Sequence, residues 1–109
     1  MAFDEAVAAR IRKAYEFVPN VVEKKMFGGI AWMVNGHMSC GVNDQRLMTR
    51  VGPDQFEAAL ARPHAQPMDF TGRPLKGFVF VEPAGFEDDA TLGDWVQMSL
   101  DFVATLPPK

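Results

Sequence analysis

The chain is poor in the residues that form disulfides and metal sites. Cys40 is its one cysteine, so no disulfide can form within the chain, and this favours a reducing compartment. A zinc site needs three or four ligands at recognisable spacings. Cys40 and two scattered histidines, His37 and His64, do not supply them. We therefore expect no metal and no cofactor.

Long apolar runs are absent as well. No stretch reaches the roughly 18 consecutive apolar residues that identify a transmembrane helix. The acidic N-terminus, Met1–Glu5, lacks the basic and apolar regions of a signal peptide. These absences predict a cytoplasmic protein that does not bind a membrane.

Positive charge is also in short supply. Lysine and arginine number 11 against 14 acidic residues, which gives a net charge of −3 and a pI of about 5.2. Domains held to nucleic acid by bulk charge are usually basic, so direct nucleic-acid binding is not favoured. We interpret the basic residues of the central region as solvated, although they can form a local patch: Lys24, Lys25, Arg46, Arg50, Arg73 and Lys76.

The composition that remains is that of one globular domain. The 109 residues are 48% hydrophobic and 23% charged, enough to bury a core, and we treat residues 1–109 as one domain. Apolar residues at helical spacing predict a first helix from Asp4 to about Phe17. A second helix is expected from Pro53 to Ala61, because proline suits the first helical position. A third is expected from Leu92 to Leu106, with Thr91 and Asp94 marking its start.

Between these helices the sequence predicts strands. Asn35-Gly36 separates two apolar runs and is a strong signal for a type I′ hairpin turn. The expected strands are Val22–Phe27, Ile30–Val34, His37–Val42, Leu47–Val51, a short Met68–Phe70, and Lys76–Val81, with loops at 62–67, 71–74 and 83–90. Short connections favour antiparallel pairing. We therefore expect an α+β fold, a two-layer sandwich of order α-β(3-4)-α-β(1-2)-α with helices on one face of the sheet.

A short motif before the hairpin makes the chain recognisable. The residues Lys25, Met26, Phe27, Gly28 and Gly29, followed by the Asn-Gly turn, resemble the N-terminal domain of the TfoX/Sxy family. Weaker matches are Gly36, Gly72 with Phe78 and Phe80, and Trp95. The resemblance implies a two-layer α/β sandwich akin to the type III secretion chaperone fold. It also implies a bacterial cytoplasmic protein, linked in some members to control of competence genes alongside a transcription activator. Larger members carry a second, C-terminal domain.

The candidate chemical groups favour structural roles. Cys40 lies in mid-strand, and His37, three residues away, is expected on the opposite face, so we interpret Cys40 as buried and structural. Gly28-Gly29 is interpreted as a bend rather than an anion-binding nest, because no Walker lysine and no GxGxxG pattern follows. The acidic residues near the last helix can hold a cation, but a solvated helix start is preferred: Glu82, Glu87, Asp88, Asp89 and Asp94.

Strand register predicts a candidate interaction surface. A two-residue Asn35-Gly36 turn places Val34 opposite His37, Met33 opposite Met38, Trp32 opposite Ser39 and Ala31 opposite Cys40. One face then carries the core residues Ala31, Met33, Met38, Cys40, Val42, Leu47, Thr49 and Val51. The opposite face carries the candidate surface Ile30, Trp32, Val34, His37, Met48 and Arg50, where Trp32 and Arg50 can make a cation–π contact. We expect this face to bind a second protein chain, most simply a copy of itself in a homodimer, unless a helix or the termini cover it.

No catalytic constellation emerges from the residues, so we do not expect an enzyme. The sequence favours a non-enzymatic regulatory or protein-interaction domain of the TfoX N-terminal type. Alternatives are a small-ligand binder or an uncharacterised enzyme on the same fold, which would need a pocket with convergent polar groups. A direct nucleic-acid binder is a further alternative, which salt-dependent binding to duplex DNA would identify.

Overall fold

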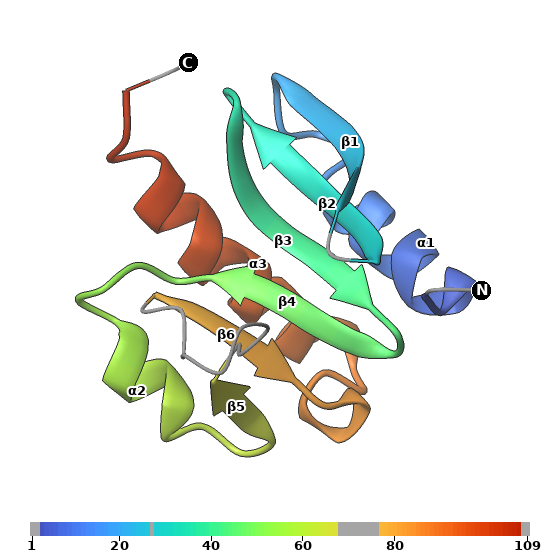
Figure 1. Ribbon diagram of the computed structural model, residues 1–109, viewed down its shortest axis with the longest axis vertical. Coiled ribbons are helices and arrows are strands. Elements are labelled where there is room, and N and C mark those ends of the chain that lie inside the picture. Colours follow the sequence, from blue (N-terminus) through green and yellow to red (C-terminus); the bar gives the residue numbers. More distant parts are fainter. Residues whose placement is uncertain (1–2, 27, 68–76, 108–109) are drawn as a thin grey trace.

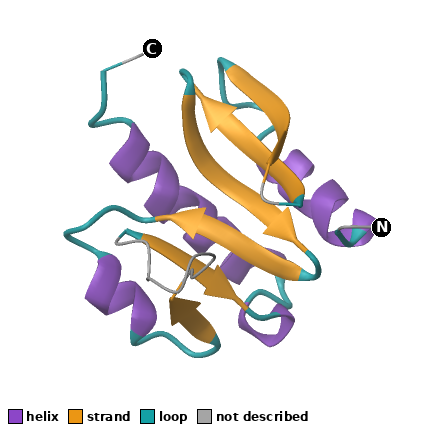
Figure 2. Ribbon diagram, viewed as in Figure 1, coloured by secondary structure: helices purple, strands orange, loops and turns teal. Residues whose placement is uncertain are grey.

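The computed structural model describes residues 3–26, 28–67 and 77–107, and it confirms an α+β fold. One six-stranded sheet, ordered β1-β2-β3-β4-β6-β5, is antiparallel at every pairing. The first and last helices pack against one face of this sheet, and the short middle helix lies beside its β5 end (Figure 1). Figure 2 shows the resulting layers of strand and helix. No helix within the described ranges is long and apolar enough to cross a membrane.

In the first half of the chain, the strands begin and end close to the residues that the sequence predicts. They are β1 (Val21–Met26), β2 (Gly29–Val34), β3 (His37–Asn43), β4 (Arg46–Arg50), β5 (Ala65–Pro67) and β6 (Phe78–Val81). The expectation that 62–67 is a loop is wrong at its end, because Ala65–Pro67 pairs with β6. Three residues of which one is proline give little strand signal. The expected strand Met68–Phe70, the turn 71–74 and Phe27 of the family motif lie outside the described residues.

The helices are α1 (Glu5–Ala14), α2 (Phe56–Leu60) and α3 (Asp89–Val103), with a 3₁₀ turn at Pro83–Gly85. All begin or end a few residues away from the expected positions. The start of α3 is the instructive case. Its N-cap is Asp88, whose carboxylate accepts a hydrogen bond of 2.6 Å from the Thr91 amide. Hydrogen bonding to the Thr91 side chain and then to this amide lowers the pKa of Asp88. The Thr91-x-x-Asp94 pattern that predicted a later start therefore lies inside the first turns of the helix.

The glycine motif and the hairpin turn have the backbone geometry that the sequence predicts. Asn35 and Gly36 both have positive φ, 52° and 85°, as a type I′ turn requires. Gly28 has φ of 75°, and a Cβ on Gly29 would lie 1.8 Å from the Val42 carbonyl oxygen. The double glycine thus provides one left-handed residue and one close approach of backbone to backbone.

A β-bulge separates the observed register from the predicted one. Met33 pairs with Met38 as predicted, but Trp32 pairs with Cys40 instead of Ser39. Ser39 is therefore an extra residue on β3. The side-chain alternation of β3 shifts by one residue at this point, so every β2 pairing beyond the bulge also differs from the prediction. Between β3 and β4 the predicted pairs, Val42 with Leu47 and Cys40 with Thr49, are confirmed.

The bulge changes which side chains face the helices. The main core lies between the sheet and α1 with α3. Its largest fully buried members are Trp32, Trp95, Phe86, Ile11, Leu47, Val42, Val51, Val79, Val81 and Val103. A smaller cluster on the opposite face contains Ala31, Met38, Met48 and Phe80, with Met33 and Phe78 packed against it. The predicted core set is thus right for the residues of β4 and the end of β3, and wrong for Ala31, Met33 and Met38.

Two glycines offer a matched test of this packing. Gly29→Ala places a Cβ against the Val42 carbonyl and should lower the free energy of unfolding by about 1–3 kcal/mol, the usual cost of overpacking. Gly93→Ala, inside α3, places a Cβ where no atom lies within 4 Å, and should raise stability by about 0.5–1 kcal/mol because alanine favours the helix. Urea unfolding of both variants measures the two changes. Equal effects of the two substitutions would contradict the observed close approach.

Candidate functional site

A buried polar cluster lies at the bulge, between the sheet and the helices. The Tyr15 hydroxyl and the Ser39 hydroxyl are 2.6 Å apart, and Ser39 is 2.8 Å from the Ser99 hydroxyl of α3. The Cys40 thiol donates to Thr49 Oγ1 at 3.3 Å. These hydrogen bonds connect α1, β3, β4 and α3, and each member of the cluster has a partner. The cluster therefore fixes the positions of these elements relative to one another.

Cys40 itself is in an environment that suppresses reactivity. The side chain is completely buried, and burial raises the pKa of its thiol. Burial likewise raises the pKa of Tyr15 far above its ordinary value. The prediction that His37 faces away from Cys40 is wrong, because the bulge places both on the helix side. His37 is nevertheless 8% exposed and directs Nε2 to the Pro107 carbonyl oxygen at 2.6 Å. His37 is thus engaged with a backbone group near the C-terminus.

The predicted interaction surface is divided between the two sides of the sheet. Trp32 and Val34 are 1% and 6% exposed and belong to the helix-side core, with Ile30 packed against it. Met48 lies in the opposite cluster and is fully buried. The expectation of an open apolar face holding these residues together is therefore wrong. Its cause is the bulge, which moves Trp32 and its neighbours beneath α1.

The aromatic partners of the arginines also differ from those expected. Arg50 lies 5.3 Å from the ring centres of Phe78 and Phe102, not over Trp32. Arg46 stacks on Phe80 at 3.8 Å. The cation near Trp32 is Arg12, at 5.9 Å. Arg46 and Arg50 thus cover aromatic rings of β6, while Arg73 and Lys76 of the suggested basic patch lie outside the described residues.

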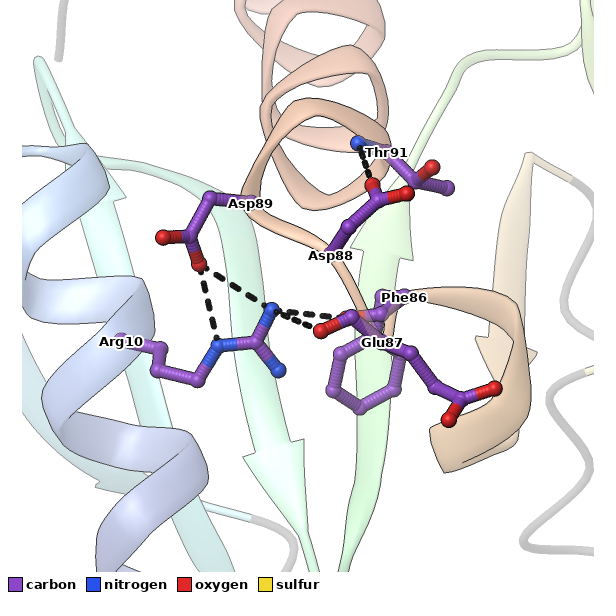
Figure 3. A network of polar contacts seen from close by, with 6 residues as sticks. All are labelled: Arg10, Phe86, Glu87, Asp88, Asp89 and Thr91. Carbon is purple, nitrogen blue, oxygen red and sulfur yellow. Dashed lines mark hydrogen bonds and ion pairs between the residues drawn. The ribbon is translucent and has the colours of Figure 1, made fainter.

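Two of the acidic residues around the start of α3, Asp88 and Asp89, serve the helix and its attachment to α1. Arg10 of α1 hydrogen-bonds to the carbonyl oxygens of Phe86 and Glu87 and pairs with Asp89 at 3.2 Å (Figure 3). Asp88 caps the helix on the other side of the turn. Within the described ranges, no group of three or more potential ligands is placed to hold a metal ion. Glu87, Asp88, Asp89 and Asp94 are exposed, as expected of a solvated helix start, whereas Glu82 is half-buried and its Oε2 has no hydrogen-bond partner among the described residues.

Two of the hollows among the described residues are lined by α1 and the elements next to it. A groove of about 680 Å³ runs between α1 and α3, with buried Leu92 and Val96 in its floor and Lys13 and Gln97 among the residues of its rim. A second hollow of about 410 Å³ lies between the end of α1 and β1. It is lined by Arg12, Tyr15, Glu16, Val18, Val21, Glu23 and Trp32.

The second hollow combines aromatic walls with an ion pair. Tyr15 and Trp32 stack with ring centres 6.4 Å apart. Arg12 donates two hydrogen bonds to Glu23, of 2.7 and 3.0 Å, and these lower the pKa of that carboxyl. The buried indole N–H of Trp32 lies near Glu23 but reaches no acceptor in hydrogen-bond geometry among the described residues. A buried donor without a partner is unfavourable, and Glu23 is the acidic group nearest to hand for this one, since Trp32 contributes to the lowered pKa of that carboxyl.

The connection from α1 to β1 and β1 itself carry exposed apolar side chains that sequence reasoning did not single out. Phe17, in the connection from α1 to β1, is 92% exposed, and Val22 on β1 is 55% exposed. The expected first helix extended to Phe17 and therefore gave it no separate role. Because α1 ends at Ala14, the residue lies beyond the helix. The Pro19-Asn20 pair was the available signal that the chain turns near this point.

Burial of Cys40 predicts that the folded protein resists thiol reagents. DTNB at pH 8 should leave the native thiol unmodified and should label one thiol per chain after unfolding in guanidinium. A Gln45→Cys variant supplies the control, because Gln45 is exposed in the β3–β4 turn and its thiol should react at once. Rapid labelling of the parent protein with an unchanged circular dichroism spectrum would contradict the burial of Cys40.

The comparison with protein families identifies one family over most of the chain. A model of the TfoX N-terminal domain matches residues 13–103 of the 109-residue chain, from the end of α1 to the end of α3. No curated protein and no solved structure matches the chain, so the likeness to the secretion chaperone fold stays a prediction. The matched residues include the buried polar cluster and all six strands, the edge strand β1 among them. This chain therefore belongs to the TfoX N-terminal domain family.

Proposed function

We propose that this protein is a non-enzymatic, cytoplasmic regulatory domain that acts by binding another protein. The exposed Phe17 carries the proposal. A phenylalanine that is 92% exposed contributes nothing to the core, and it lies beside β1, where Val22 is also exposed. Apolar side chains gathered at one edge of a small domain are typical of a contact surface, and aromatic residues are enriched in such surfaces.

The groups capable of chemistry support the same proposal. Cys40 and Tyr15 are buried with raised pKa values, and His37 is engaged with a backbone carbonyl. A catalytic role for any of these three groups would require it to reach substrate. Membership of the TfoX N-terminal domain family is consistent with regulation, including the control of competence genes that the family resemblance suggests.

A second function is favoured by the groove between α1 and α3. Its volume of about 680 Å³ falls within the range of small-molecule pockets, and its floor is apolar. A ligand bound there would be lost from a Gly93→Arg variant, because Gly93 lines the groove. Native mass spectrometry of the purified protein would detect such a ligand in the parent and not in the variant.

Site-specific photo-crosslinking tests the proposed interaction. With p-benzoylphenylalanine at position 17, illumination of the producing cells should give a discrete adduct larger than the protein itself. The same amino acid at position 57 provides the matched control, because Glu57 is exposed on α2, far along the sheet from β1. Adducts that are absent at position 17, or identical at both positions, would contradict a binding surface at Phe17.

A further inference from the structure

Strand β1 is an edge of the sheet. It pairs with β2 along its whole length, from Val21 with Val34 to Met26 with Gly29, and no strand in the described part of the chain pairs with its other side. The view in Figure 1 shows β1 at the border of the sheet, next to the end of α1. An edge strand presents backbone N–H and C=O groups to which another extended chain can hydrogen-bond.

The charges of this edge select among such chains. Lys24 and Lys25 are exposed, and neither makes an ion pair among the described residues. The acidic member of the strand, Glu23, is held by two hydrogen bonds from Arg12. The edge therefore offers two free cations and no free anion. A chain with acidic residues opposite the lysines is the one that complements it.

The other half of β1 is apolar. Val21 borders the hollow that contains Val18 and Trp32, while Val22 points to the opposite face, where it is 55% exposed. A strand added along β1 would place one side chain beside the hollow and the next beside Val22, since side chains alternate along a strand. Both positions favour β-branched or other apolar residues.

We propose that β1 binds an extended, acidic segment of a partner protein as a seventh strand of the sheet. This inference rests on the proposed protein-binding function and specifies the partner's chemistry. In an antiparallel arrangement the segment reads, in order, two acidic residues opposite Lys25 and Lys24, any residue opposite Glu23, and two apolar residues opposite Val22 and Val21. Backbone hydrogen bonds supply the affinity, and the acidic and apolar positions supply the specificity.

A second copy of the chain is a poorer occupant. Two antiparallel β1 strands in one continuous sheet share faces only when paired residue numbers sum to an even value, because opposed residues lie on the same side. A sum of 46 places Glu23 opposite its own copy, and a sum of 48 does the same with Lys24. Each of these registers brings like charges together at the symmetry axis, which is unfavourable, while the sum of 48 also sets Glu23 opposite Lys25 on both sides of the axis. A sum of 44 sets Val22 opposite its own copy and avoids like charges, but it gives neither Lys24 nor Lys25 an acidic partner, which an acidic segment does.

Fluorescence polarisation with two labelled peptides tests the proposal. One contains Glu-Glu-Thr-Val-Val flanked by serines, and the other has both glutamates replaced by lysine. The parent should bind the acidic peptide about tenfold more tightly, since two opposite-charge pairs become like-charge pairs in the lysine peptide. Methylation of alternate backbone nitrogens in the acidic peptide, in two complementary versions, should abolish binding in the version whose N–H groups face β1.

Charge reversal on the protein completes the test. Lys24→Glu should weaken the acidic peptide and strengthen the lysine peptide, whereas Lys13→Glu, the same charge change on α1 at the rim of the other groove, should do neither. Equal effects of the two variants, or equal binding of both N-methylated versions, would overturn strand addition. A dimer found by light scattering and lost in Lys24→Glu would replace the partner segment by a second copy. If the peptides fail while position 17 still crosslinks to a partner, this inference fails and the proposed function stands.

Discussion

The bulge at Ser39 and Cys40 determines how this domain is built. One extra residue on β3 turns both side chains toward the helices, where Ser39 meets Tyr15 and Ser99 and Cys40 meets Thr49. Each hydrogen bond is worth about 0.5–1.5 kcal/mol, and leaving one of these buried groups without a partner costs more than that. The bulge, the buried cluster and the placement of Trp32 beneath α1 are therefore one arrangement, and α1 and α3 take their positions from it.

Short sequence motifs were sufficient to predict most of the fold. Asn35-Gly36 fixes its turn because few other residues accept two positive φ values, and the glycine pair before β2 behaves as predicted for the same reason. The bulge could not be read in this way, because its hydrogen bonds join residues 24 and 60 positions apart in the chain. The period of a strand is two, so one unpredicted residue reversed the faces of everything beyond it. The candidate interaction surface was deduced from that register, so it was wrong for the same reason.

The shifted register also explains why binding is proposed at the edge strand β1 and not on a face of the sheet. With Trp32 and Val34 in the core and Met48 buried on the other side, the faces of the sheet no longer offer the predicted apolar patch. The exposed apolar side chains, the free lysines and the unpartnered indole N–H instead gather around β1 and the end of α1. The residues concerned can each be read from the sequence, but only the paired strands and the end of α1 at Ala14 bring them to one edge of the sheet.

The position of Trp32 tests this account most directly, because the two registers place it on opposite faces. Nuclear Overhauser effects between assigned side chains distinguish them. The bulged register predicts contacts from the Trp32 indole to the Tyr15 ring, whose centre is 6.4 Å away. Contacts between Trp32 and Met48, with none between Trp32 and Tyr15, would show the regular register and contradict the account.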